Sequence, residues 1–150
     1  MLERIFPRQL DNDYRGWRAG LWVFGLVLVM KGMQSVMIIF NGWTTVRDAD
    51  GIPLESYPAD AAQNVVTVFA QSSLWRLIVC AMGVVVLVRY RSAVALMFVV
   101  FIASYLGAQV LSLWAPLIRV GSPPGTYVNL VGFAVMVVGL VFSLMSRREE

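Results

Sequence analysis

The sequence contains no histidine and only one cysteine, Cys80. Without histidine, the chain lacks the commonest metal ligand and the usual proton shuttle in catalysis. A single cysteine cannot form an internal disulfide or a thiolate cluster. Its neighbours in the stretch LIVCAMG are apolar, which indicates a small buried residue. We therefore expect neither a metal site nor a cofactor in this chain.

Charged residues are also scarce. They make up 14% of the 150 residues, against about 25% in soluble domains. Hydrophobic residues make up 59%, and the mean hydropathy is +0.72. A soluble core of this size could not bury so much apolar surface, so the composition predicts a protein solvated by a bilayer. The pI of about 9.4 comes from basic residues that flank apolar runs, and it does not indicate a nucleic-acid partner.

Catalytic motifs are missing from the sequence. It offers no Ser-His or Cys-His pair, no carboxylate pair within an apolar run and no glycine-rich phosphate loop. A serine–lysine dyad of Lys31 with Ser72 or Ser73 is the enzymatic alternative, and it requires a neutral lysine. The segment from Asp48 to Glu55 lacks most of the oxygen ligands of a calcium loop. We expect a protein that is not an enzyme.

Four apolar stretches are long enough to cross a membrane as helices. They predict an all-α, polytopic membrane protein: a bundle of four transmembrane helices forming a single domain over residues 1–150. Pro58 suits the first position of a helix that begins outside the membrane. The expected boundaries are a leader at 1–18, helices at about 19–40, 65–88, 93–115 and 126–145, an outer loop at 41–64 and a tail at 146–150.

The arginines predict the orientation of this bundle. Those outside the apolar runs cluster in the leader, in the connection around Tyr90 and in the tail, whereas the opposite side holds only Arg47 and Arg119. By the positive-inside rule, both termini are expected in the cytoplasm. Arginine-rich, lysine-poor usage is typical of a GC-rich bacterial genome, so we expect a multi-pass protein of the plasma (bacterial inner) membrane. The clustered residues are Arg4, Arg8, Arg15, Arg18, Arg89, Arg91, Arg147 and Arg148.

Two cations, Lys31 and Arg76, lie near the middle of predicted membrane helices. A charge at that depth costs about 2.5–3.5 kcal/mol on insertion scales, and no Asp or Glu occurs in the four predicted spans. Polar residues spaced three or four apart share a helix face with each cation and fall in the outer half of each span. The inner halves, at 21–30, 81–88, 94–102 and 136–144, are almost purely apolar. We therefore predict an outward-facing polar recess above an apolar plug, lined by Lys31, Arg76, Gln34, Ser72, Ser73, Tyr105 and Gln109.

The two cations allow a structural and a functional interpretation. In the first, they bind helix carbonyls and nearby amides, or the outer loop folds over them with its carboxylates. In the second, the recess holds an anionic group, because arginine binds both oxygens of a phosphate or carboxylate. Two glycine pairs, Gly16 with Gly20 and Gly132 with Gly139, predict close helix approach within one subunit or at an oligomer interface. The candidate loop carboxylates are Asp48, Asp50, Glu55 and Asp60.

The leading functional hypothesis is an accessory or scaffold subunit that binds a membrane partner or an anionic lipid. Its expected partners are membrane lipids, with another membrane protein or a second copy of the chain as further candidates, and no nucleic acid. The alternative is a small transporter or channel subunit for an anionic or amphipathic solute, which requires the recess to open inward as well.

Overall fold

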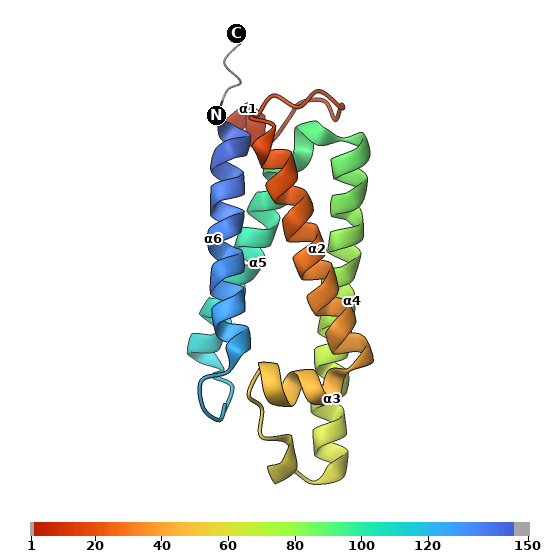
Figure 1. Ribbon diagram of the computed structural model, residues 1–150, viewed down its shortest axis with the longest axis vertical. Helices are drawn as coiled ribbons and strands as arrows, with labels where there is room; N and C mark the ends of the chain where they lie inside the picture. The colour runs from red at the N-terminus through yellow and green to blue at the C-terminus, as the bar shows by residue number, and fades with distance from the viewer. Residues whose placement is uncertain (1, 146–150) are drawn as a thin grey trace.

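The computed structural model describes residues 2–145, with side chains from Arg4 onward. The predicted tail at 146–150, with Arg147 and Arg148, lies outside this range. Every regular element within it is helical, and Figure 1 shows the four long ones side by side. The elements are α1 (Leu2–Ile5), α2 (Ala19–Phe40), α3 (Gly42–Thr44), the π-helix η1 (Thr45–Ala49), the 3₁₀-helix η2 (Leu54–Ser56), α4 (Ala59–Arg89), the 3₁₀-helix η3 (Arg91–Ala93), α5 (Val94–Trp114) and α6 (Pro124–Leu144).

Four of the described helices, α2, α4, α5 and α6, are long and apolar enough to cross a membrane, which confirms the predicted number of spans. The chain thus has the make-up of a multi-pass membrane protein. Helix α4 has 31 residues, which at about 1.5 Å each is longer than the hydrocarbon core of about 30 Å. It begins after Pro58, as expected, and ends at Arg89. Helix α6 begins two residues earlier than predicted because Pro124 occupies its first position.

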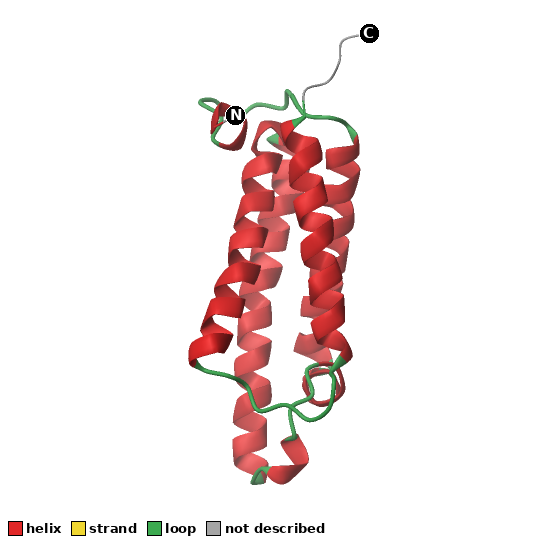
Figure 2. Cartoon of the chain, turned by 90° about the vertical axis from the view of Figure 1, so that its left-hand side faces the viewer, coloured by secondary structure: helices red, strands yellow, loops and turns green. Residues whose placement is uncertain are grey.

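The four helices are packed as an incomplete ring. Helix α2 packs along both α4 and α6, and α5 packs along α6, but α4 and α5 make few contacts although a short connection joins them. Figures 1 and 2 show the leader and that connection at one end of the bundle, and the segments around α3 and before α6 at the other. We call these the leader end and the loop end. The tight connection makes α4 and α5 antiparallel, as predicted, but it does not hold them together along their length.

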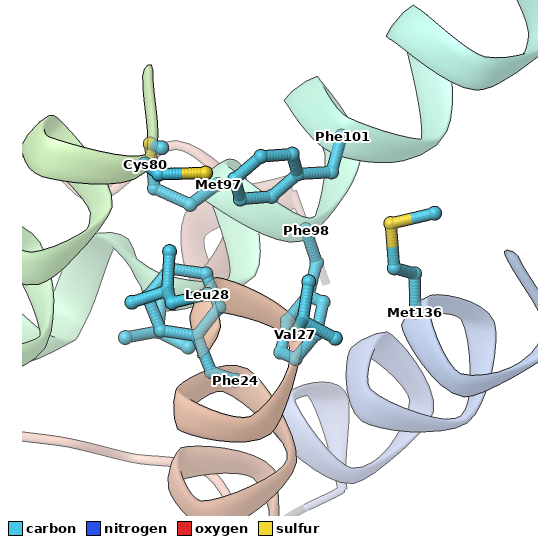
Figure 3. Packing of buried hydrophobic residues seen from close by; sticks show 9 residues of the cluster. Phe24, Val27, Leu28, Cys80, Met97, Phe98, Phe101 and Met136 are labelled. Atoms are coloured by element: carbon cyan, nitrogen blue, oxygen red, sulfur yellow. The ribbon is translucent and has the colours of Figure 1, made fainter. Parts of the chain in front are cut away.

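The main core lies in the half of the bundle nearer the leader end. Figure 3 shows how its side chains pack against one another. Phe24 of α2 and Phe98 of α5 are both fully buried, and their rings meet edge to face with centroids 5.2 Å apart. This cluster occupies the predicted apolar plug, with Cys80 one residue outside the predicted range. Its buried members are Phe24, Val27, Leu28, Cys80, Val94, Met97, Phe98, Phe101 and Met136.

Glycines allow the helices to approach closely around this core. A Cβ at Gly139 would overlap the ring of Phe98, and one at Gly20 would lie 2.9 Å from the Ser143 Oγ. At Gly16, a Cβ would lie 2.6 Å from the carbonyl oxygen of Ser143. Three of the four predicted glycines thus let helices or the leader approach within one subunit, whereas Gly132 borders the side chain of Lys31.

The leader folds across the ends of α5 and α6. Helix α1 ends before Pro7, whose ring is incompatible with a continuing helix. The Arg4 Nη1 donates to the Leu144 carbonyl at 2.6 Å, and the Trp17 amide donates to the Phe142 carbonyl at 3.0 Å. Phe6 and Leu10 are each 60% exposed, in keeping with the amphipathic pattern of the leader.

A candidate anion-binding recess

A cavity of about 210 Å³ lies at the loop end, between the four long helices and the two segments that connect them. It corresponds in position to the predicted recess. Lys31, Arg76, Tyr105 and Gln109 of the predicted set line it. The full lining consists of Lys31, Asp50, Arg76, Phe101, Ser104, Tyr105, Ala108, Gln109, Ser112, Arg119, Thr126, Asn129 and Met136.

Lys31 is held by amide oxygens and not by a carboxylate. Its Nζ donates to the Asn129 Oδ1 at 3.2 Å and more weakly to the Gln34 Oε1 at 3.4 Å. Gln34 lies one turn further along α2, so it shares the face of Lys31, as predicted. A Cβ at Gly132 would lie 3.7 Å from the Nζ, which is an ordinary contact distance, so Gly132 borders the ammonium group without being required for its position. The positive charge of Lys31 is therefore solvated but not neutralised.

Arg76 faces the same cavity from α4, and Arg119 faces it from the segment before α6. Arg76 forms no hydrogen bond or ion pair with any part of the chain that the structure describes. Among the described residues, the Arg119 side chain donates only to the Thr126 hydroxyl, at 3.3 Å. Arg76 and Lys31 are close enough to repel one another electrostatically. The guanidinium donors of both arginines thus remain available to a ligand.

Asp50 is the one carboxylate among the described lining residues. It is carried there by a turn at Gly51, which has a φ of +70° that favours glycine. The Val120 amide donates to the Gly51 carbonyl at 2.8 Å and so joins the two loop segments. Gly125 lets the start of α6 approach, since a Cβ there would lie 2.5 Å from the Ala49 carbonyl oxygen. These contacts place Asp50 over the recess.

The four loop carboxylates have different surroundings. Burial raises the pKa of Asp50, and the nearby positive charges of Arg119 and Arg76 oppose this effect. Asp48 and Glu55 instead pair with Arg47 on the surface, at 2.7 and 3.3 Å. The hydrogen bond from Arg47 lowers the pKa of Asp48. Asp60 lies exposed in the first turn of α4. Only Asp50 therefore offsets the cations of the recess.

Ser72 and Ser73 were predicted to line the recess, but neither is among the residues that surround the cavity. The exposed Ser72 hydroxyl donates to the Val68 carbonyl at 2.9 Å, which is a common way for a helical serine to satisfy its hydrogen bond. Ser73 is buried, and no hydrogen bond joins either serine to Lys31 within the described structure. The geometry of a serine–lysine dyad is not formed.

Sequence reasoning did not include Arg119 and Asn129 among the lining residues, and it named Asp50 only as one of four loop carboxylates that could fold over the cations. Asn129 carried a usable signal, because it is the polar residue of its helix nearest the depth of Lys31. Asp50 and Arg119 lie in segments without helical periodicity, and their positions depend on contacts between the two loops. Among the described residues, no group of three or more metal-ligating side chains comes together.

Comparison with known proteins returned no matching family model, no matching curated protein and no matching solved structure.

Proposed function

We propose that the recess binds the anionic group of an amphiphile, and that the protein acts as a non-enzymatic membrane subunit that holds this lipid or lipid-like partner. The observation that carries the proposal is the imbalance of charge: Lys31, Arg76 and Arg119 share one cavity with a single carboxylate, Asp50. Arg76 and Arg119 are exposed at the cavity, and an anion would complete the hydrogen bonding of their guanidinium groups through charge-assisted hydrogen bonds.

The open side of the recess favours an amphiphile over a small soluble anion. Helices α4 and α5 separate toward the loop end, and the α5 residues Ser104, Gln109 and Ser112 line the cavity yet remain exposed. In a bilayer this opening faces lipid, so an acyl chain could lie between the helices while the anionic group enters the recess. Exposed apolar residues on the same half of α5, such as Leu113 and Trp114, would contact that chain.

The predicted orientation completes this proposal. The distribution of arginines supports cytoplasmic termini and an outward-facing loop end. The arginine-rich, lysine-poor composition supports the plasma membrane as the host membrane. The amphiphile then belongs to the outer leaflet. The apolar core separates the recess from the leader end. The amphiphile would therefore enter the recess from the outer leaflet, and no transport through the bundle is required.

Purification in native lipid, followed by mass spectrometry of the bound molecules, tests the proposal. We expect an anionic amphiphile to accompany the natural protein and to be lost from the Lys31→Met/Arg76→Leu variant, which removes two positive charges at nearly constant side-chain volume. Arg18→Gln/Arg89→Gln is the matched control, because it removes two exposed charges at the leader end. Retention of the same molecules by the recess variant would refute the proposal, as would their equal loss from both variants.

A further inference from the structure

A second cavity, of about 360 Å³, lies at the opposite end of the bundle. The leader covers it on one side, and residues of α5 and α6 form the other. Three arginines line it, Arg4, Arg8 and Arg15, and none of the other described lining residues is a carboxylate. It shares no residue with the recess. This concentration of guanidinium groups around a hollow is typical of a site for phosphate.

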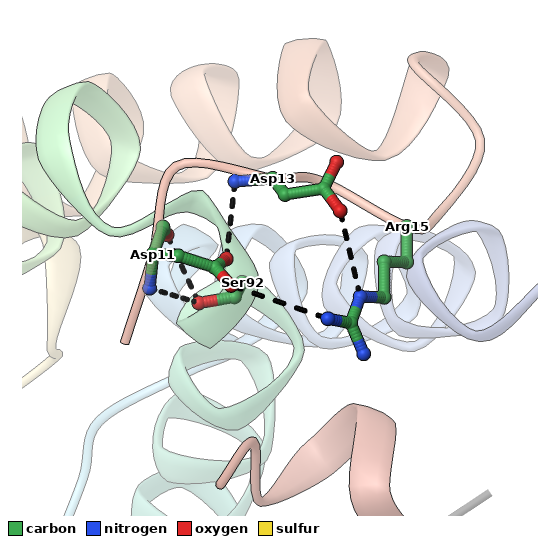
Figure 4. A network of polar contacts seen from close by, with 4 residues as sticks. All are labelled: Asp11, Asp13, Arg15 and Ser92. Carbon is green, nitrogen blue, oxygen red and sulfur yellow. Dashed lines mark hydrogen bonds and ion pairs between the residues drawn. The ribbon is translucent and has the colours of Figure 1, made fainter. Parts of the chain in front are cut away.

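Two of the three arginines are positioned with donors to spare. Arg4 is anchored through the 2.6 Å hydrogen bond from its Nη1 to Leu144, which leaves its remaining N–H groups unused by that contact. Arg15 lies near the carboxylates of Asp11 and Asp13 at 4.0 and 3.7 Å, longer than the usual hydrogen-bond range of about 2.7–3.2 Å. Figure 4 shows its third nitrogen pointing away from both carboxylates. A phosphate could therefore engage Arg15 without displacing a strong ion pair.

Neutral hydroxyl groups complete the lining. The Tyr14 hydroxyl donates to the Ser143 Oγ at 2.9 Å, and Ser92 exchanges hydrogen bonds with the backbone of Asp11 at 3.0 Å. Burial raises the pKa of the Tyr14 phenol, which keeps it protonated and uncharged near neutral pH. These bonds hold the leader against α5 and α6, so the walls of the cavity are fixed by contacts other than those of the arginines.

The surroundings of the cavity indicate that its ligand is a lipid. Phe6, Leu10 and Trp17 of the leader are exposed by 60%, 60% and 48%, and Trp17 packs edge to face on Phe142 with centroids 4.9 Å apart. Apolar and aromatic side chains at helix ends are typical of the boundary between headgroups and acyl chains. We propose that this cavity binds the phosphate of an anionic phospholipid headgroup in the leaflet at the leader end. This site is independent of the proposed recess ligand.

Calorimetric titration of the full-length protein in detergent tests the site, with dihexanoyl phosphatidic acid as the lipid probe and inorganic phosphate as the free anion. We expect Arg4→Gln/Arg15→Gln to weaken phosphatidate binding by at least about tenfold, because charge-assisted hydrogen bonds are lost. The control Arg18→Gln/Arg89→Gln should bind nearly as the natural protein does. Arg15→Gln alone, which breaks no contact shorter than 3.7 Å, should also weaken binding if the double variant does not fold.

Each other result overturns the proposal. Absence of phosphatidate binding, or equal weakening in the leader variant and its control, would show that no specific site exists. Inorganic phosphate that binds as tightly as phosphatidate would assign the cavity to a free anion. If Lys31→Met/Arg76→Leu lost phosphatidate binding while Arg4→Gln/Arg15→Gln retained it, the lipid would be placed in the recess at the other end of the bundle.

Discussion

The two halves of the bundle are built from the same four helices, yet they pack in opposite ways. Near the leader end, aromatic and branched side chains meet across glycines and leave the buried rings of Phe24 and Phe98 in contact. Near the loop end, α4 and α5 separate, and polar side chains surround a cavity. One half therefore supplies the packing that holds the helices together, while the other leaves room for charged and polar side chains between them.

The largest expected effect comes from opening the packed half. Phe98→Ala removes a ring that is fully buried between α2 and α6. We expect the free energy of unfolding to fall by at most about 3–5 kcal/mol, since lipid reduces the transfer component of the loss. Thermal unfolding in detergent measures the change. Met33→Ala on α2, at a 64% exposed position of the loop half, should leave the melting temperature unchanged.

Gly139→Ala should have the next largest effect. The added methyl group would overlap the Phe98 ring and lie 2.8 Å from the Val23 Cγ1, so α6 must move away from α2 and α5. We expect a loss of about 1–3 kcal/mol. Gly107→Ala is the matched control in the loop half, where nothing lies within 4 Å of the new atom. An equal loss at both positions would mean that the halves are packed alike.

Asp50→Asn should have a smaller effect, on the pH dependence of the stability of the folded protein. Because burial raises the folded-state pKa of Asp50 above its ordinary value of 3.8, its protonated form is favoured in the folded protein. This contribution to stability is fully present below pH 3.8 and is lost as pH rises through the folded-state pKa. Melting temperatures of the natural protein and of Asp50→Asn, measured from about pH 3 to about pH 8, should show that the substitution removes this decline. Asp48→Asn should not remove it, because the pKa of Asp48 is shifted downward.

Arg47→Gln should have the smallest effect. Its pairs with Asp48 and Glu55 lie on the surface, where water and salt screen them. We expect no measurable shift in melting temperature and no change in the amphiphile that accompanies the protein. A clear loss of that amphiphile would move the binding site from the recess to the outer surface of the loop.

Helix number, the apolar plug and half of the recess could be predicted from the sequence, because they depend on run length and on spacing along single helices. The three-to-four residue spacing put Gln34 beside Lys31, and Tyr105 and Gln109 on one face of α5. Ser72 shares a face with Arg76 but is not among the residues that line the cavity, and its hydroxyl donates to the Val68 carbonyl of its own helix. Sharing a face therefore does not by itself bring a residue into the cavity.

The loop residues of the recess could not be predicted on the same basis. Asp50 and Arg119 are brought to the cavity by the hydrogen bond from Val120 to Gly51 and by the approach of Gly125 to Ala49. These contacts join segments far apart in the sequence, and no periodic pattern encodes them. Similarly, the sequence used Arg4 and Arg15 only to predict the orientation of the bundle. The fold of the leader brings both residues to one cavity.

Thiol labelling along α5 tests the contrast between the halves most directly. In a Cys80→Ala background, single cysteines at Ser104, Gln109 and Met97 would be treated with a membrane-impermeant maleimide in reconstituted vesicles, with the reagent present on both sides. The polar recess above an apolar core predicts reaction at 104 and 109 and none at 97. Reaction at 97 would contradict the closed core and favour a transport pathway, and protection at 109 would contradict the recess itself.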